Sequence, residues 1–183
     1  ISVTKIGVSA FSNCRSLSGI YVDANNPNYS SDDRGVLFSK EKTLLIEAPG
    51  AISGSYIIPD RVNTIGDYAF YYCHDLGSVK IPDSVTSIGK YAFYDCNSLS
   101  SVEIPDSVTT IGRYAFYECD SLSRITFTGN GPSIGQNAFY CDIATAYYPG
   151  NNPTWTYDIL SRNFGGTITW VPYDPDNLPD IAT

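Results

Sequence analysis

The chain has 183 residues, a hydrophobic content of 43% and a formal net charge of −8, which provides enough apolar material for one folded domain and excludes a disordered chain. The acidic balance argues against nucleic acid and against an anionic membrane surface as partners, because both attract Lys and Arg. No run approaches the roughly eighteen apolar residues that a spanning helix needs, so we expect no membrane insertion.

The first element in the chain is one copy of a repeat that returns from residue 59 onwards. An Ile-Gly pair recurs every 23 positions, at Ile65, Ile88, Ile111 and Ile134, and an Ala-Phe pair follows it at Phe70, Phe93, Phe116 and Phe139. The earlier copy holds the same residue types in the same order, at Ile6, Phe11, Cys14, Leu17, Ile20 and Val22. Because Val3 and Ile6 match Val85 and Ile88, we expect the chain to begin within a repeat, with further repeats or a cap upstream.

An insertion follows the first copy. Phe11 and Phe70 lie much further apart than one period, so additional residues separate the first copy from the next. Within the insertion, residues 36–38 and 44–46 are predicted strands, joined by a turn at residues 40–42. The oxygen-rich residues before them are Asn25, Asn26, Asn28, Asp32 and Asp33. Calcium is bound by such oxygens, but the spacing of these residues fits turns better.

Three complete copies come next, and each predicts one short strand per coil. Val102 and Ile104 alternate along the chain, so both side chains point inward, and Pro105 ends the strand because it has no N–H to donate. Gly112 is expected to adopt a backbone angle that other residues resist. Phe93 and Phe116 are expected to be fully buried, because a single coil can bury its apolar residues only against its neighbours.

The last part of the chain departs from the repeat after Phe139. Apolar residues at helical spacing predict a helix, formed by Trp155, Ile159, Leu160 and Phe164. Gly165 and Gly166 are expected to end it, and residues 167–171 to form a final strand. Residues 172–183 are rich in proline and acid, and we interpret them as a linker or tail.

The repeated frame I-P-x-S-V-T-x-I-G-x-Y-A-F-x-x-C-x-x-L resembles the BspA-like (Treponema-type) leucine-rich repeat family, over residues 1 to about 171. The resemblance implies an α+β repeat solenoid, a right-handed superhelix with short parallel strands. It also implies a leucine-rich repeat domain over residues 1–171, with a β-hairpin module at about 25–55 and a helix-strand cap at about 150–171. Members of this family occur largely in secreted and surface proteins of host-associated bacteria, where adhesion and protein binding without catalysis are implied.

Catalytic, metal and cofactor sites are not expected. His74 occupies a variable position of the repeat, held elsewhere by Arg15, Asn97 and Asp120, and no nucleophile accompanies it as general-base catalysis would require. The five cysteines lack a C-x-x-C spacing. Neighbouring coils about 4.8 Å apart hold cysteines further apart than the roughly 3.8 Å between Cβ atoms in a disulfide. We therefore predict a column of buried free thiols.

Tyrosine supplies the candidate partner-binding residues. One column contains Tyr68, Tyr91 and Tyr114, and a second contains Tyr71, Tyr94, Tyr117 and Tyr140. Exposed tyrosine favours recognition, whereas a ladder of rings stacked on one another would be structural. We take the second column as the candidate partner site and the first as structural. The outward residues of the predicted strands form a solvated sheet face, comprising Gly19, Tyr21, Ser78, Lys80, Ser101, Glu103, Arg124 and Thr126.

Together these observations predict a non-catalytic binding or adhesion module of an extracellular or cell-surface bacterial protein. The partner would be a protein, from the host or a bacterial surface, or a glycan. A structural spacer that displays another domain, and a glycan-binding module, remain the alternatives.

Overall fold

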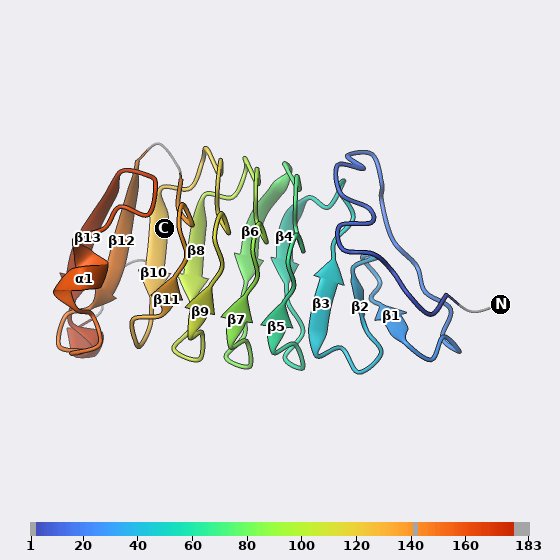
Figure 1. Ribbon diagram of the computed structural model, residues 1–183, viewed down its shortest axis with the longest axis horizontal. Coiled ribbons are helices and arrows are strands. Elements are labelled where there is room, and N and C mark those ends of the chain that lie inside the picture. Colours follow the sequence, from blue (N-terminus) through green and yellow to red (C-terminus); the bar gives the residue numbers. More distant parts are fainter. Residues whose placement is uncertain (1–2, 141–142, 178–183) are drawn as a thin grey trace.

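The structure, a computed structural model, describes residues 3–140 and 143–177. Figure 1 shows coils stacked along the long axis, with the first copy of the repeat at one end and the C-terminal strands at the other. The coils carry their strands in two rows on opposite sides of the stack. The predicted solenoid is therefore confirmed.

The two rows of strands are mainly parallel ladders that repeat coil by coil. One sheet has the order β1-β2-β3-β5-β7-β9-β11, formed by β1 (Tyr29–Ser31), β2 (Leu37–Ser39), β3 (Leu44–Glu47), β5 (Thr64–Ile65), β7 (Ser87–Ile88), β9 (Thr110–Ile111) and β11 (Ser133–Ile134). The other row contains β4 (Gly54–Ile57) paired with β6 (Leu76–Lys80), and the sheet of β8 (Ser101–Ile104), β10 (Arg124–Phe127), β12 (Ala144–Pro149) and β13 (Ile168–Tyr173). Ile65 pairs with Ile88, and Ile88 pairs with Ile111. Residues that are one repeat apart in the sequence are therefore paired in adjacent strands.

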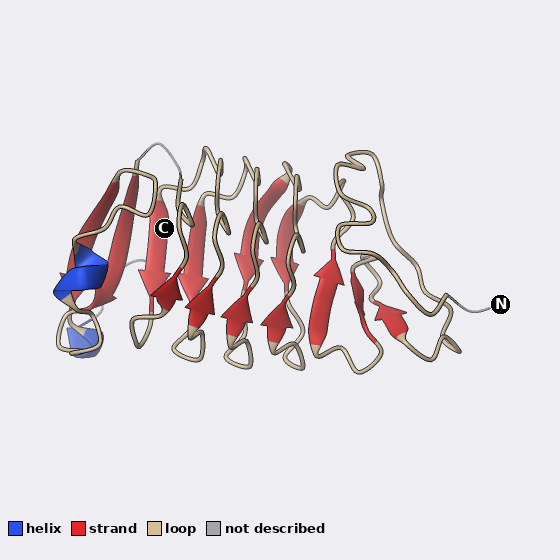
Figure 2. Cartoon of the chain, viewed as in Figure 1, coloured by secondary structure: helices blue, strands red, loops and turns tan. Residues whose placement is uncertain are grey.

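Helix is almost absent from the described residues, so the predicted α+β class is not confirmed and the fold is a β-solenoid (Figure 2). The helix expected across residues 155–164 is reduced to α1 (Tyr157–Leu160), and a short 3-10 helix follows at Pro175–Asn177. Trp155 and Phe164 are buried in the core cluster instead of extending a helix. The spacing of these apolar residues therefore reflects their packing against the core at the end of the stack. A loop can bring the side chains to that core as well as a helix can.

The inserted residues form antiparallel pairs beside the parallel ladder. The strands predicted at 36–38 and 44–46 correspond to β2 and β3, which pair antiparallel, as do β1 and β2. The oxygen-rich residues make turns as predicted: Asn26 Oδ1 accepts the N–H groups of Asn28 and Tyr29, and Asp32 Oδ1 accepts those of Arg34 and Val36. These contacts fix the chain on both sides of β1.

The core is a column of aromatic rings surrounded by aliphatic side chains. Phe93 and Phe116 are fully buried, as predicted. The rings of Phe70, Phe93, Phe116 and Phe139 stack face to face, with centroids 4.9–5.3 Å apart. The first copy differs, because Phe11 is only half-buried and Cys14 is exposed. Among the described residues, the core positions of this coil are therefore less buried than those of the central coils.

The repeated glycine has a different role from the one expected. Gly112 is not among the glycines with positive φ. A Cβ atom at Gly112 would lie 2.6 Å from the carbonyl carbon of Gly89 and from the amide nitrogen of Lys90 in the neighbouring coil. The glycine column is needed because adjacent backbones approach closely there, and it does not supply a special backbone angle.

Glu47 completes the backbone ladder where the insertion interrupts it. In the complete copies the phenylalanine N–H donates to an alanine carbonyl of the next coil, for example Phe93 to Ala115 at 2.7 Å. The N–H of Phe11 instead donates to the Glu47 carboxylate, at 3.1 and 3.2 Å from its two oxygens, and the Ser12 hydroxyl donates to Oε1. The carboxylate, only 3% exposed, thus replaces a missing carbonyl and attaches the first coil.

Burial of Glu47 makes the attachment of the first coil dependent on pH. Burial raises the pKa of this carboxyl above its ordinary 4.5, although the hydrogen bonds from Phe11 and Ser12 act in the opposite direction. A carboxyl whose pKa is higher in the folded than in the unfolded state stabilises the protein at pH values below the unfolded-state pKa. That stabilisation is lost as the pH rises through the folded-state pKa. We therefore expect Glu47→Gln to become more stable relative to the wild type as the pH rises above the ordinary carboxyl pKa of 4.5. Urea unfolding of both proteins at several pH values measures this difference, and a difference that does not change with pH would contradict the prediction.

The described cysteines are free. Cys73, Cys96 and Cys119 are buried, and the Sγ atoms of Cys96 and Cys119 lie 3.1 and 3.0 Å from phenylalanine carbonyl oxygens of the preceding coil. Cys14 is exposed, which corrects the expectation that every thiol is buried, and Cys141 lies outside the described residues. Burial raises the pKa of the Cys73 and Cys96 thiols, which keeps them protonated and unreactive.

We predict that all five thiols of the chain are free. The aligned cysteines belong to adjacent coils, where hydrogen bonds to backbone carbonyls already hold the buried thiols. Titration with a thiol reagent after denaturation, without reductant, should therefore detect every one. Two missing thiols would demonstrate a disulfide and overturn the prediction.

Candidate functional site

The first tyrosine column forms a continuous stack. Tyr68, Tyr91 and Tyr114 have ring centroids 4.9 and 5.0 Å apart and planes within 13° of parallel. Each adopts a left-handed backbone conformation, with φ of 63°, 56° and 58°, which is unusual for a bulky residue. The guanidinium of Arg113 lies 5.9 Å from the ring centroids of both Tyr91 and Tyr114. The geometry is that of the structural ladder expected for this column.

The second column, Tyr71, Tyr94, Tyr117 and Tyr140, is referred to below as the tyrosine strip. The rings of Tyr94, Tyr117 and Tyr140 stack with centroids 5.0 and 4.5 Å apart, and Tyr71 is tilted by 34° against Tyr94. The first three rings are half-buried, and Tyr140 is 45% exposed. The ring faces therefore contact one another, and the strip offers mainly ring edges and hydroxyl groups to a partner.

The two columns touch edge to face and form a single aromatic surface. Tyr68 packs against Tyr71 with centroids 5.2 Å apart, and Tyr114 packs against Tyr117 at 5.4 Å. Burial raises the pKa of Tyr71 to about 12, and it also raises the pKa of Tyr117. These hydroxyls are thus neutral at physiological pH, able both to donate and to accept hydrogen bonds.

Charged groups lie along one border of the strip. The Tyr94 hydroxyl donates to Glu118 at 3.2 Å. His74 Nε2 lies 2.9 Å from Asp95 Oδ2 in the next coil, and the Arg15 guanidinium lies over the Tyr72 ring. The pairing of His74 with Asp95 was not predicted, although the two residues are almost one coil period apart in the chain. Over residues 3–140 and 143–177, the His, Cys, Asp and Glu side chains form no cluster of three that could hold a metal ion.

Only part of the sheet face matches the expectation of a small, polar, solvated surface: Gly19 and Arg124 are half-buried, and the large side chains of Tyr21 and Ile57 are 70% and 67% exposed. Ser78, Lys80, Ser101 and Glu103 are exposed. Thr126 is only 8% exposed, so it does not belong to the solvated face. Thr126 pairs in register with Tyr147 of β12. The larger side chain of Tyr147 beside it accounts for the burial of Thr126.

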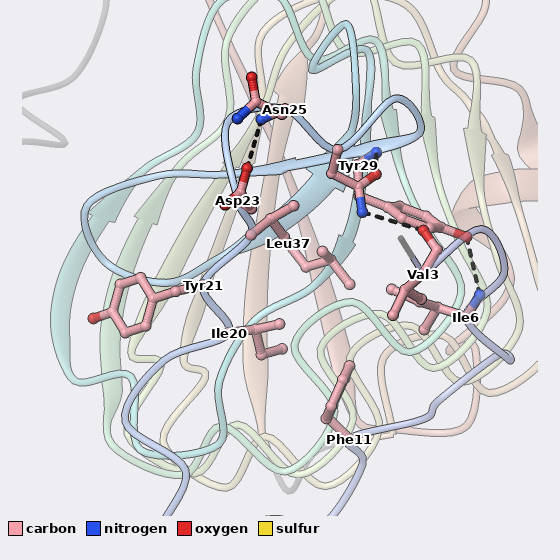
Figure 3. A pocket seen from close by; sticks show the side chains of 11 residues that line it. Val3, Ile6, Phe11, Ile20, Tyr21, Asp23, Asn25, Tyr29 and Leu37 are labelled. Atoms are coloured by element: carbon pink, nitrogen blue, oxygen red, sulfur yellow. Dashed lines mark hydrogen bonds between the residues drawn. The ribbon is translucent and has the colours of Figure 1, made fainter. Parts of the chain in front are cut away.

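Sequence reasoning did not find a hollow at the N-terminal end of the stack. Figure 3 shows Val3, Ile6, Phe11 and Leu37 around it, with the Tyr29 hydroxyl accepting a hydrogen bond from the Ile6 N–H. Its volume is about 620 Å³, and its rim includes Asp23 and Asn25. The hollow is lined by side chains of the first copy of the repeat and of the insertion.

The comparisons with known proteins identify the family. The family described as "BspA type Leucine rich repeat region" matches residues 1–32 and 53–163 in six copies. The chain therefore belongs to the BspA-type leucine-rich repeat family, a class of bacterial proteins whose members are generally interaction or surface modules. Among curated proteins, no significant relative is found.

Solved structures share the fold. A leucine-rich repeat protein from Eubacterium ventriosum has a TM-score of 0.68 at 26% identity, over 91% of this chain and 45% of its own. A leucine rich cell surface protein from Faecalibacterium prausnitzii has a TM-score of 0.54 at 26% identity, over 97% of this chain and 50% of its own. The pneumococcal vaccine antigen PcpA matches at 22% identity with a TM-score of 0.53, over 86% of this chain and 51% of its own, which shows the fold alone. The chain spans about half the length of these proteins. Within the described residues, no helix has the length and apolar content needed to cross a membrane.

Proposed function

We propose that this chain is a non-catalytic binding or adhesion module of a secreted or cell-surface bacterial protein, and that its partner contacts the tyrosine strip. The sequence predicts a repeat domain over residues 1–171, and in this proposal the domain extends slightly further. The domain continues at least to Tyr173, since that residue ends β13 and its buried hydroxyl donates to the Phe127 carbonyl at 2.9 Å. Similarity to a cell surface protein from Faecalibacterium prausnitzii supports the location.

One observation carries the choice of surface. Seven tyrosines gather in two touching columns on adjacent coils, and their rings hold each other in place. A rigid aromatic surface loses little conformational entropy on binding, which favours it as the centre of an interface. The described sheet face has no comparable aromatic group.

A structural spacer is the second candidate, and the same stacking favours it. If the rings serve only to hold the coils together, their outer edges need no partner. A glycan-binding module is favoured less, because sugar rings stack on free aromatic faces and most of the faces here are covered.

The double variant Tyr94→Ser/Tyr117→Ser separates binding from a purely structural role. Protein and glycan arrays first identify a ligand. We expect the double variant to bind this ligand about tenfold or more weakly per folded molecule, because it lacks the centre of the strip. Titration calorimetry on folded protein provides the measurement, and Tyr157→Ser, which removes a tyrosine that is 87% exposed elsewhere, is the control. A lower melting temperature with unchanged binding per folded molecule would assign the strip to structure alone.

A further inference from the structure

The tyrosine strip ends in one aromatic face that no described ring covers. Phe116 donates its N–H to Ala138, the residue before its equivalent Phe139, and Phe139 donates in the same way to Phe164. By this register Gly165 takes the place of the next phenylalanine, and Gly166 takes the place of the next tyrosine. Glycine has no side chain to lay over the ring. One face of Tyr140 stacks on Tyr117, no described ring stacks on the other face, and the residue is 45% exposed.

A carboxylate without an ionic partner lies along the same strip. Glu118 accepts a hydrogen bond from the Tyr94 hydroxyl, and among the described residues no basic side chain forms a salt bridge with it. Asp95 differs, because His74 pairs with it. Two coil steps separate the ring of Tyr94 from the ring of Tyr140, with centroid distances of 5.0 Å for the first step and 4.5 Å for the second.

We propose that the open face of Tyr140 and the carboxylate of Glu118 bind two cationic side chains of a basic protein segment. This rests on the proposed function and names the chemistry of its partner. The face of an aromatic ring carries negative charge density and attracts Lys and Arg. In an extended segment, residues two and four apart point to the same side and lie about 6.6 and 13 Å apart, so one segment can place two cationic side chains along a strip whose rings repeat every 4.5–5.0 Å. The net charge of −8 favours approach of a basic segment over an acidic one.

The covered faces argue against a polysaccharide as the partner. A sugar chain that stacks on successive rings requires several free faces, whereas the faces within the strip lie 4.5–5.0 Å from the next ring. A single cation requires one face only. The ring edges offer hydroxyl oxygens that accept N–H groups, which suits guanidinium and ammonium donors.

A labelled hexa-arginine peptide tests the proposal by fluorescence anisotropy at two salt concentrations. Tyr140→Leu removes the aromatic face, and we expect it to weaken binding about two- to fivefold. Tyr140→Phe keeps the face and should bind as the wild type does. Glu118→Gln should weaken binding by a similar factor, and the matched control Asp83→Asn, which removes an exposed charge distant from the strip in sequence, should leave binding within about twofold of the wild type.

Each of the following results would overturn this inference. Tyr140→Leu could bind hexa-arginine unchanged, or Asp83→Asn could weaken it as much as Glu118→Gln, which would show attraction by net charge alone. Maltohexaose could bind the wild type and be lost in Tyr140→Leu, which would make the open face a sugar platform. Finally, Tyr94→Ser/Tyr117→Ser could lose its array ligand while Tyr140→Leu and Glu118→Gln bind hexa-arginine normally. The strip would then remain a binding site, and only the proposal that it binds cationic side chains would be rejected.

Discussion

Replacing Phe93 by Ala is expected to lower the free energy of unfolding by about 3–5 kcal/mol. The side chain is fully buried, and its ring lies between those of Phe70 and Phe116, at 4.9 Å from each. The substitution leaves a cavity that the two neighbouring coils cannot close, since hydrogen bonds from Phe93 to Ala115 and from Phe70 to Ala92 fix their spacing. Urea unfolding followed by circular dichroism measures the loss.

Two controls make this result specific. Phe93→Leu fills most of the cavity and should cost clearly less than Phe93→Ala. Tyr157→Ala removes an aromatic ring that is 87% exposed and should change the stability by no more than about 0.5 kcal/mol. A loss below about 1 kcal/mol for Phe93→Ala would show that the column is not a continuous core.

Periodicity alone predicted the central coils correctly. Residues that recur at a constant spacing must occupy equivalent places in stacked coils, so the burial of Phe93 and the pairing of Ile88 with Ile111 followed directly from the repeat. The same reasoning failed at the ends. Cys14 belongs to the repeat but is exposed, and among the described residues its coil packs against the coil that follows it. Burial in a solenoid depends on the adjacent coil, and a single copy of the pattern does not contain that information.

The sequence predicted that the four tyrosines align in one column, but it did not predict the geometry of their rings. The tyrosine strip consists of the four residues selected by spacing, but the sequence did not determine whether their faces or their edges are exposed. The stacking depends on ring orientation, and Tyr91 and Tyr94 reach it from backbones of different φ. Glu47 was missed for a related reason: it lies in the insertion, where no period indicates that its carboxylate meets the Phe11 N–H.

Gly112→Ala is expected to lower the free energy of unfolding by about 1–3 kcal/mol through overpacking. The added Cβ would lie 2.6 Å from two backbone atoms of the neighbouring coil, the carbonyl carbon of Gly89 and the amide nitrogen of Lys90. Backbone atoms cannot rotate away as a side chain can. The coils must therefore separate, which stretches the 2.8 Å hydrogen bond from the Gly112 N–H to the Ile88 carbonyl.

Gly77→Ala is the matched control, because its added Cβ would have no neighbour closer than 3.5 Å. Neither glycine has a positive φ, so backbone strain does not distinguish the two substitutions. Any difference in unfolding free energy, measured in urea on both variants, therefore reports the closeness of the coils. Equal stability of the two variants would mean that the solenoid opens at Gly112 without cost. The recurrence of glycine in coil after coil would then need a cause other than the close approach of adjacent backbones, since Gly112 has no positive φ.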